Sequence, residues 1–338
     1  MSRALIQLRR LRHRLRHRAQ ARAARLALMR HAQVPAPQLD LALVIPVWND
    51  AAGLARLLER ARALGVFSQI IVVDDGSDVP VPQTPDVTLI RHKTPLGGGV
   101  ARNAGLDLVT AQHVLFFDAD DLILPPLAEL QRDLARHLAG GAVFDFCLFK
   151  HADSRVSLEP RWGQPDWDDA LWARAGHGCG ALAPALPEAL HVLAQTANYP
   201  WNKIYRTAFL RAHGLRCAAT AVHQDIPLHW LGFVAADNVL VSDRICAWHG
   251  VQSGAARLTN RAGRERLQVF AALAPVVNAL AQRGDAAWQG ALMAFLPGLM
   301  EWIEARIDPV FRDEFEEAKS RFLAETVSHW RASKVGSP

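Results

Sequence analysis

Short apolar runs alternate with amphipathic stretches through the first half of the chain. The runs contain few polar residues, which is typical of strands buried on both faces of a parallel sheet. We predict strands at 41–47, 69–73, 87–92, 113–117 and 142–149, and helices at 50–64, from the glycines at 97–99 and at 125–139. This alternation predicts an α/β fold in which a mostly parallel sheet carries helices on both faces.

The second half of the chain follows a different pattern. Residues 151–200 are rich in tryptophan and are predicted to be irregular. Helices are expected at 207–213 and 226–233, a strand at 239–247, and mostly helices after Leu258. We therefore divide the chain into an N-terminal tail with a proline-containing linker (1–38), an α/β domain (39–255) and a helical C-terminal region (256–338). The last region either packs on the domain or contributes to a homo-oligomer.

An acidic cluster follows the apolar run at 113–117. It contains Asp118, Asp120 and Asp121. In open α/β sheets, ligands bind at the carboxyl ends of the strands. Three adjacent carboxylates repel one another unless a cation or hydrogen-bond donors compensate them. We interpret the cluster as a divalent-cation or diphosphate site; the alternative is structural, with Asp121 capping the helix at 125–139.

A second acidic turn follows the run at 69–73 and contains Asp74, Asp75 and Ser77. Alone it would be an ordinary turn. Because it lies at another strand end, beside the first cluster, we favour a shared pocket. One of its carboxylates could accept a hydrogen bond from a base N–H group or a ribose hydroxyl.

The glycine run begins a predicted helix, where backbone N–H groups can approach an anion. It is not a dinucleotide-binding fingerprint, because no third glycine follows in register. Gly99, Arg102 and Asn103 are candidate donor-binding residues. Arg102 either contacts a diphosphate or forms a salt bridge with Asp107 or with a carboxylate at the sheet edge.

Four segments, in this order and spacing, resemble the N-terminal half of family 2 glycosyltransferases. They are VIPVWN (44–49), VVDDGS (72–77), GGGVARNAGL (97–106) and VLFFDADD (114–121). WNKIYR (201–206) is a weaker continuation, similar to a segment of bacterial members that decorate surface polysaccharides. The resemblance implies a GT-A fold, a nucleotide-sugar donor and inverting transfer.

The resemblance also implies roles for individual residues. Metal binding, by Mn or Mg, falls on Asp118 and Asp120, and the catalytic base falls on Asp225. Gln224 departs from the glutamate that the family usually has before this acid. A structural alternative for Asp225 is a helix N-cap before Ile226. The nucleotide contacts fall on Asp75 and on the turn formed by Pro46, Val47, Trp48 and Asn49.

Other side chains leave two interpretations open. His249 is either a late metal or phosphate ligand or a histidine of the core or rim. Lys203 faces the diphosphate or pairs at the surface. Aromatic rings can stack on sugars or seal a small core, and both interpretations stand for Trp162, Trp167 and Trp172.

Composition limits the remaining classes of protein. Half of the residues are apolar and there are four cysteines, none in a Cys-x-x-Cys pair. A disulfide framework or zinc site is therefore not expected, and a reducing cytosol fits. No apolar run approaches the roughly 20 residues of a membrane span, and no apolar signal segment is recognised. We expect a cytoplasmic protein, with peripheral attachment to the inner face of the membrane as an option.

The net charge of +5 arises from the tail. Residues 1–33 contain ten arginines and no acidic residue, whereas the rest of the chain has 28 basic and 33 acidic residues. The body is therefore not expected to bind nucleic acid. The leucines of the tail follow helical spacing, with arginines on the other faces. Such a tail is a solvated helix that packs on its own domain or is partly disordered, a helix on an anionic membrane surface, or a segment that makes nucleic-acid or other contacts.

These features together predict a metal-dependent inverting glycosyltransferase. It would move a sugar to a glycan, a lipid-linked or another hydroxyl acceptor, in cell-surface polysaccharide or glycoconjugate synthesis. The alternatives are a non-catalytic GT-A-fold binding or scaffold protein and a nucleotidyltransferase. The second would carry its glycine-rich loop on the first strand, which here ends in PVWND.

The tail generates a prediction about membrane binding. Each arginine near an anionic bilayer contributes about 1 kcal/mol, and salt screens this attraction over ~8 Å. The full chain should therefore co-sediment with vesicles containing phosphatidylglycerol at low salt, and release at high salt. A chain starting at Pro37 should stay in the supernatant. Equal pelleting of both chains, or of neither, would contradict membrane attachment by the tail.

Overall fold

The computed structural model describes residues 38–154, 166–176, 182–250 and 260–335. Contacts group residues 39–338 into one compact unit, separate from residues 1–38, and only that larger unit is described here. The predicted tail helix and Trp162 lie outside the described residues. The predicted boundary at 255 stays a prediction.

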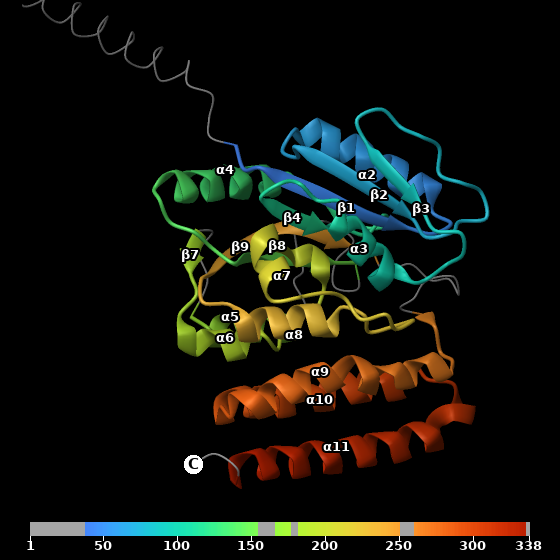
Figure 1. The fold of residues 1–338 in the computed structure, drawn as a ribbon, viewed down its shortest axis with the longest axis vertical. Coiled ribbons are helices and arrows are strands. Elements are labelled where there is room, and N and C mark those ends of the chain that lie inside the picture. The colour runs from blue at the N-terminus through green and yellow to red at the C-terminus, as the bar shows by residue number, and fades with distance from the viewer. Residues whose placement is uncertain (1–37, 155–165, 177–181, 251–259, 336–338) are drawn as a thin grey trace, which may run out of the picture. The chain divides into compact units, whose positions relative to one another are not determined.

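Strands and helices alternate along the described chain (Figure 1). The strands are β1 (Leu41–Val47), β2 (Gln69–Asp74), β3 (Thr88–Arg91), β4 (His113–Phe116), β5 (Leu122–Ile123), β6 (Phe146–Asp153), β7 (Leu182–Pro184), β8 (Lys203–Arg206) and β9 (Val239–His249). The helices are α2 (Ala51–Leu64), α3 (Gly98–Asp107), α4 (Pro126–Ala139), α5 (Asp166–Arg174), α6 (Pro187–Leu193), α7 (Thr207–Ala212), α8 (Ile226–Ala235), α9 (Gln268–Arg283), α10 (Ala286–Glu304) and α11 (Arg312–Val335).

All nine strands belong to one sheet with the order β3-β2-β1-β4-β8-β6-β9-β5, and β7 pairs with β9. Its first half, β3-β2-β1-β4, is parallel. The chain builds outward from β1 to β3 and then returns to the other side of β1 with β4, so the topological switch point lies between β1 and β4. Beyond β4 the sheet is mixed, because β8 runs antiparallel to both β4 and β6. The α/β fold class is confirmed, with antiparallel pairs in the second half.

Helices cover both faces of the sheet, as predicted. Alternate residues of β1 point to opposite sides: Ala42 and Val44 join one apolar cluster, and Leu43 and Ile45 join the other. The second cluster contains the apolar faces of α2 and α4, and the first contains those of α3, α7 and α8. Figure 1 shows these two layers above and below the strands.

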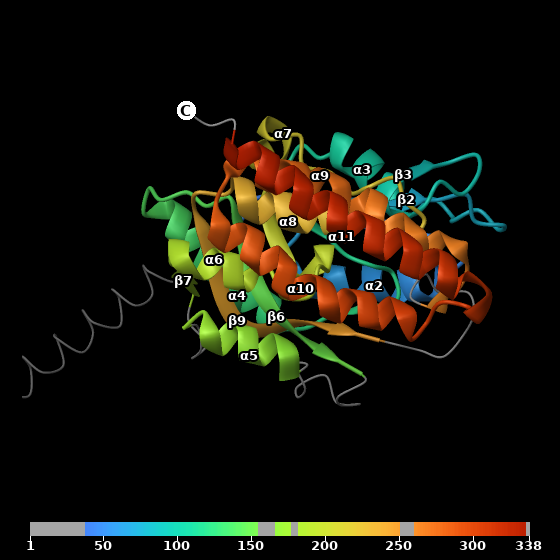
Figure 2. The ribbon, with the colours of Figure 1, turned by 90° about the horizontal axis from the view of Figure 1, so that it is seen from below.

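The C-terminal helices form a further layer on the side of α8. α9 contacts α8, and α9, α10 and α11 contact one another; the three lie side by side in Figures 1 and 2. Trp330 of α11 is buried and donates from Nε1 to the carbonyl oxygen of Val277 at 3.1 Å. Among the described residues, no helix is both long and apolar enough to cross a bilayer.

Four of the five strands predicted in the first half occur within one or two residues of their predicted bounds. The fifth is shifted: β6 begins at Phe146, four residues later than the predicted start. The preceding residue, Asp145, is buried and accepts from the backbone N–H groups of Asp237 and Asn238, both at 2.9 Å. This carboxylate fixes the end of the loop, so strand pairing begins only after it. The sequence interpretation also missed β5, β7 and β8, and two helices in the region predicted to be irregular, α5 and α6.

α3 packs closely on the sheet at Gly105. A Cβ atom there would lie 2.4 Å from Cγ1 of Val44 and 3.3 Å from Cγ2 of Val73, both in buried strands. Gly105→Ala should therefore lower the free energy of unfolding by ~1–3 kcal/mol, as overpacking does. The control is Gly290→Ala in α10, where a Cβ atom meets nothing within 4 Å and stability should stay or rise slightly. Matching denaturation midpoints for the two variants would contradict the packing described here.

Candidate active site

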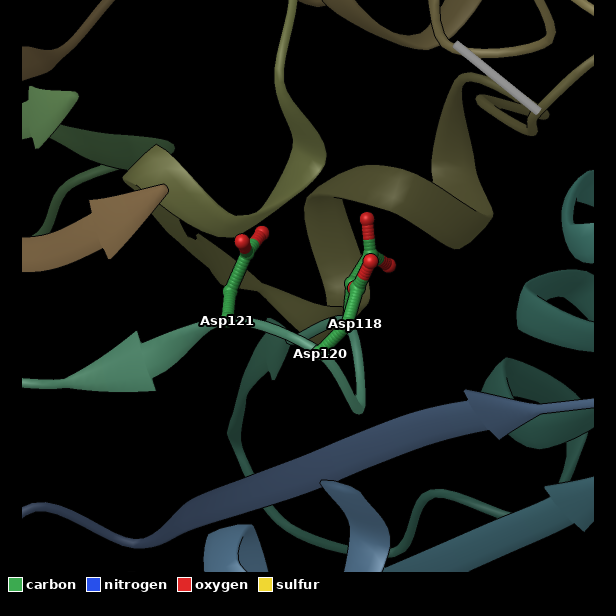
Figure 3. Close-up of side chains that lie close together, drawn as sticks. All are labelled: Asp118, Asp120 and Asp121. Atoms are coloured by element: carbon green, nitrogen blue, oxygen red, sulfur yellow. The ribbon is translucent and has the colours of Figure 1, made fainter. Parts of the chain in front are cut away.

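The acidic cluster lies directly beyond β4, at the switch point of the sheet. Asp118 and Asp121 close a turn in which the Asp121 N–H donates to the Asp118 carbonyl oxygen at 3.2 Å. Carboxylate oxygens of Asp118, Asp120 and Asp121 all lie within 4.8 Å of one another. Figure 3 shows the side chains of Asp118 and Asp120 side by side, with Asp121 projecting from the same turn. The turn therefore gathers three carboxylates into one small volume.

Asp121 joins this turn to the end of β9. Its Oδ1 accepts from Nδ1 of His249 at 2.9 Å and from the N–H of Gly250 at 3.0 Å. Its Oδ2 is buried and has no hydrogen-bond partner in the described structure. Burial lowers the pKa of His249, but the charge and hydrogen bond of Asp121 outweigh this and raise it. The interpretation of Asp121 as the cap of α4 was wrong, because Pro125 occupies the N-cap position.

Arg102 provides a positive charge beside the cluster. Its Nη2 forms an ion pair with Oδ1 of Asp118. The guanidinium is buried, and its Nε and Nη1 have no hydrogen-bond partner in the part of the chain that is described. Burial disfavours the charged form, but Asp118 raises the pKa of Arg102 above its usual value. Two ion pairs of Arg102 were considered from the sequence, and the one with the strand-end carboxylate, Asp118, forms. Asp107 pairs instead with Arg216 at 2.5 Å.

Asp74 and Ser77 hold the turn after β2. The Asp74 carboxylate accepts from the N–H of Ser77 at 2.9 Å and from the N–H of Val81 at 3.1 Å, and it forms an ion pair with Arg91. Burial raises the pKa of Asp74, but these donors outweigh it and leave the pKa below its usual value. The structure thus places Asp74 inside the turn it stabilises.

Asp75 anchors the approach to α3. Its carboxylate accepts from the N–H groups of Leu96 and Gly97 at 2.9 and 2.7 Å, and it contacts Nδ1 of His92 at 2.7 Å. Gly97 has a φ of 100°, which favours glycine, and it is the N-cap residue of α3. Asp75 therefore sets where the glycine-rich helix begins.

The turn after β1 places its residues beside the turn after β2. Asn49 has a φ of 53°, and its N–H donates to Oγ of Ser77 at 3.0 Å. Val47 is buried, Pro46 is half-buried, and Trp48 is an exposed large apolar residue. The two segments predicted to contact the nucleotide are therefore neighbours in the structure.

The glycine-rich end of α3 is covered by the loop that leads to α8. Gln224 accepts through Oε1 from the Gly99 N–H at 2.7 Å. A Cβ atom at Gly99 would lie 2.3 Å from the carbonyl oxygen of Ala218, so only glycine fits. Asn103 exchanges two hydrogen bonds with the backbone of Cys217, at 2.9 and 3.0 Å. Gly99 and Asn103 thus bind this loop, with Gln224 as the partner of Gly99. These contacts were not predicted from the sequence.

One cavity of about 750 Å³ lies beside Asp118, α3 and the start of α8. Asp225, Asp118, Arg102 and His249 all line it. Asp225 occupies the N-cap position of α8, yet its side chain makes no capping hydrogen bond. The alternative interpretation of this side chain as a helix cap is therefore not supported. Burial raises the pKa of Asp225 to about 6, against the lowering effect of Arg102.

Several predicted candidates do not line this cavity, among them Lys203 and Trp172. Lys203 is buried and donates from Nζ to the Tyr199 carbonyl oxygen at 3.0 Å and to Oδ1 of Asn202 at 2.5 Å. Burial lowers the pKa of its ammonium group to about 7. Trp172 belongs to the core, with Lys150 over its ring at 5.4 Å. Lys203 thus neither pairs at the surface nor lines the cavity.

Part of the chain resembles a known protein family. Residues 42–172 match the family model described as "Glycosyl transferase family 2". The chain is 40% identical over 87 residues to the "Pre-mycofactocin glycosyltransferase" of Mycobacterium tuberculosis, covering 24% of this chain and 18% of that protein. It is 34% identical over 110 residues to the "Succinoglycan biosynthesis protein ExoO" of Rhizobium meliloti, covering 30% and 31%. The matches thus span less than a third of either relative.

A solved structure confirms the fold over a longer span. The crystal structure of TarS residues 1–349 from S. aureus, in complex with UDP-GlcNAc, superposes with a TM-score of 0.51. The match covers 88% of this chain and 93% of that one, at 17% sequence identity. At this identity the likeness shows the GT-A fold alone. The predicted resemblance and the fold class are thereby confirmed.

Proposed function

We propose that this chain, which carries a glycosyltransferase family 2 region at residues 42–172, transfers a sugar from a nucleotide-sugar donor to a hydroxyl acceptor, with inversion at the anomeric carbon. One observation carries the proposal: a single cavity contains a carboxylate with a raised pKa, Asp225, together with Asp118 of the acidic cluster and the buried Arg102. A base, a cation site and an anion-binding group within one cavity are the groups that this reaction needs.

The acidic cluster fits a divalent cation. Its three carboxylates lie close together, and Oδ2 of Asp121 is buried without a partner in the described structure. Oxygen ligands of this kind suit Mg²⁺ and Mn²⁺. We assign Asp118 and Asp120 as ligands. A bound cation would supply Lewis-acid stabilisation of the negative charge on the departing diphosphate.

His249 is the remaining candidate ligand. Its Nδ1 is held by Asp121, and a carboxylate on one ring nitrogen commonly orients the other nitrogen toward a metal. Asp121 is then a positioning residue for His249. Arg102 would bind the diphosphate through its unpartnered N–H groups, because a buried guanidinium is well suited to phosphate oxygens.

The reaction has one displacement step. Asp225 accepts the proton of the acceptor hydroxyl. At the same time, the oxygen of that hydroxyl forms a bond to the anomeric carbon of the donor. The bond from that carbon to the phosphate oxygen breaks, and the nucleoside diphosphate leaves with the bonding electrons. A single displacement by one nucleophile inverts the anomeric configuration. We place the nucleotide against the neighbouring turns after β1 and β2, with Pro46–Asn49, Asp75 and Ser77.

The relatives support a role in polysaccharide or glycoconjugate synthesis. One is named for succinoglycan biosynthesis, and the TarS structure contains UDP-GlcNAc. We propose a nucleotide-sugar donor here, a glycan or lipid-linked acceptor, and a cytoplasmic site of action with the tail on the inner membrane face. We favour an enzyme over a scaffold protein. Gln224, the departure from the family pattern, binds the Gly99 N–H of α3, and Asp225 still lines the cavity.

The cation site generates a prediction at Asp120. Asp120→Asn removes one negative charge from the cluster on a partly exposed turn, so the fold should persist while metal affinity falls. Nucleoside diphosphates with Mn²⁺ should raise the melting temperature of the wild type by mass action, and this shift should largely vanish in the variant. Asp243→Asn, outside the cavity, is the control. An unchanged Mn²⁺-dependent shift in Asp120→Asn would show that the cluster is structural.

The base generates a prediction at Asp225. Asp225→Asn should lower turnover by ~10²-fold or more, as loss of a general base does, with nucleotide affinity little changed. Because only the carboxylate accepts the proton, wild-type kcat/KM should fall tenfold per pH unit below the pKa of about 6. The measurement is nucleoside diphosphate release against pH. A parallel loss of nucleotide binding would instead place Asp225 in the donor pocket.

A further inference from the structure

One wall of the cavity is formed by α10, which lies outside the family region at 42–172. The wall is a helical stripe, since its residues are three or four positions apart and therefore share one face. Its members are Ala294, Phe295, Gly298, Leu299 and Trp302. The C-terminal helices thus do more than cover α8: one of them borders the space next to the proposed base.

The two sides of this cavity differ in chemistry. The groups proposed for catalysis, Asp118, Arg102 and Asp225, belong to the sheet edge, α3 and the start of α8. The α10 side presents mostly aliphatic and aromatic carbon, and Leu171 of α5 adds to it; one charged group, the Arg266 guanidinium, lies over the Trp302 ring at 4.7 Å. A volume of about 750 Å³ lies within the usual range for small-molecule sites, about 300–1,000 Å³. A purely polar acceptor would leave the apolar wall without a complementary surface.

Gly298 keeps space open along this wall. A Cβ atom at this position would meet no atom within 4 Å. Glycine within a helix weakens it by roughly 1 kcal/mol relative to alanine. A glycine on the cavity side of α10 is therefore a position where a side chain could be accommodated by the fold and would take volume from the cavity.

We propose that the acceptor carries an apolar group beside its reactive hydroxyl, and that α10 binds this group while the hydroxyl reaches Asp225. The acceptor class is a sugar linked to an apolar aglycone. Phe295 and Leu299 provide the contact surface, and Gly298 determines how large the aglycone can be. The proposal rests on the proposed function, because it assigns the acceptor of that reaction.

The test uses the full chain and alkyl β-glucosides with methyl, butyl, hexyl and octyl groups, each below its micelle concentration. Binding is measured directly by calorimetry, without donor. Each methylene group that becomes buried should strengthen binding roughly fourfold. The octyl glucoside should therefore bind at least tenfold more tightly than the methyl glucoside. With a sugar-nucleotide donor, the longer glucosides should also stimulate nucleotide release most.

Two glycine variants of the same helix separate a specific site from general adsorption. Gly298→Gln places a polar side chain in the cavity, and Gly290→Gln places the same side chain at a helix position that does not line it. Both positions are open to a Cβ atom, so both variants should fold, as circular dichroism can check. Gly298→Gln should abolish the chain-length dependence, and Gly290→Gln should keep it.

The outcomes are distinct from those for the proposed function. No dependence on chain length in the wild type, including no binding of the octyl glucoside, overturns the acceptor assignment. So does an equal loss in both glycine variants, which would indicate adsorption elsewhere. Failure of the proposed function would appear separately, as loss of the Mn²⁺-dependent nucleotide shift in the wild type.

Discussion

Three carboxylates at the end of β4 repel one another, and the structure around them is arranged to offset that repulsion. The compensation comes from distant segments: Arg102 of α3 pairs with Asp118, and His249 and Gly250 at the end of β9 donate to Asp121. Because α3 belongs to the parallel half of the sheet and β9 to the mixed half, this electrostatic requirement joins both halves at one point. The cavity proposed as the active site lies beside this point.

α3 also determines where the proposed base lies relative to the cluster. Its first turn binds Gln224 through the Gly99 N–H, and Asn103 binds the backbone of Cys217 one turn later. Arg102, between them in sequence, pairs with Asp118. One helix therefore holds the loop that carries Asp225 and the carboxylate proposed to bind the cation. Gln224 supplies an acceptor for the helix N-terminus without adding a negative charge beside Asp225, and a glutamate there would raise the pKa of that carboxyl further.

The sequence was sufficient where structure depends on local pattern. β1 and β2 were predicted from continuous apolar runs, and the acidic turns were placed correctly because parallel strands end at one edge. It was insufficient where a contact joins residues far apart in the chain. β8 is short, and it forms a strand by pairing with β4 and β6. No periodic pattern of apolar residues in its own sequence predicts this pairing. Both interpretations of Lys203 assumed an accessible side chain, but Lys203 is buried in β8. Gln224 stood out as a departure from the family, but its hydrogen bond to Gly99 joins residues that are 125 positions apart in the chain.

The division of the cavity separates two requirements of a transferase. The charged groups proposed to act on the donor, Asp118 and Arg102, lie within the region matched by the family model. The surface proposed for the acceptor comes from α10, which follows that region in sequence and contacts α6, α9 and α11. Substitutions on α10 should change an apolar surface without disturbing Asp118, Asp121 or Arg102, because the ion pairs described for these residues do not involve that helix. A fold that hosts many functions changes them at such sites. We therefore expect acceptor preference to vary with α10 while the cation and diphosphate groups stay the same.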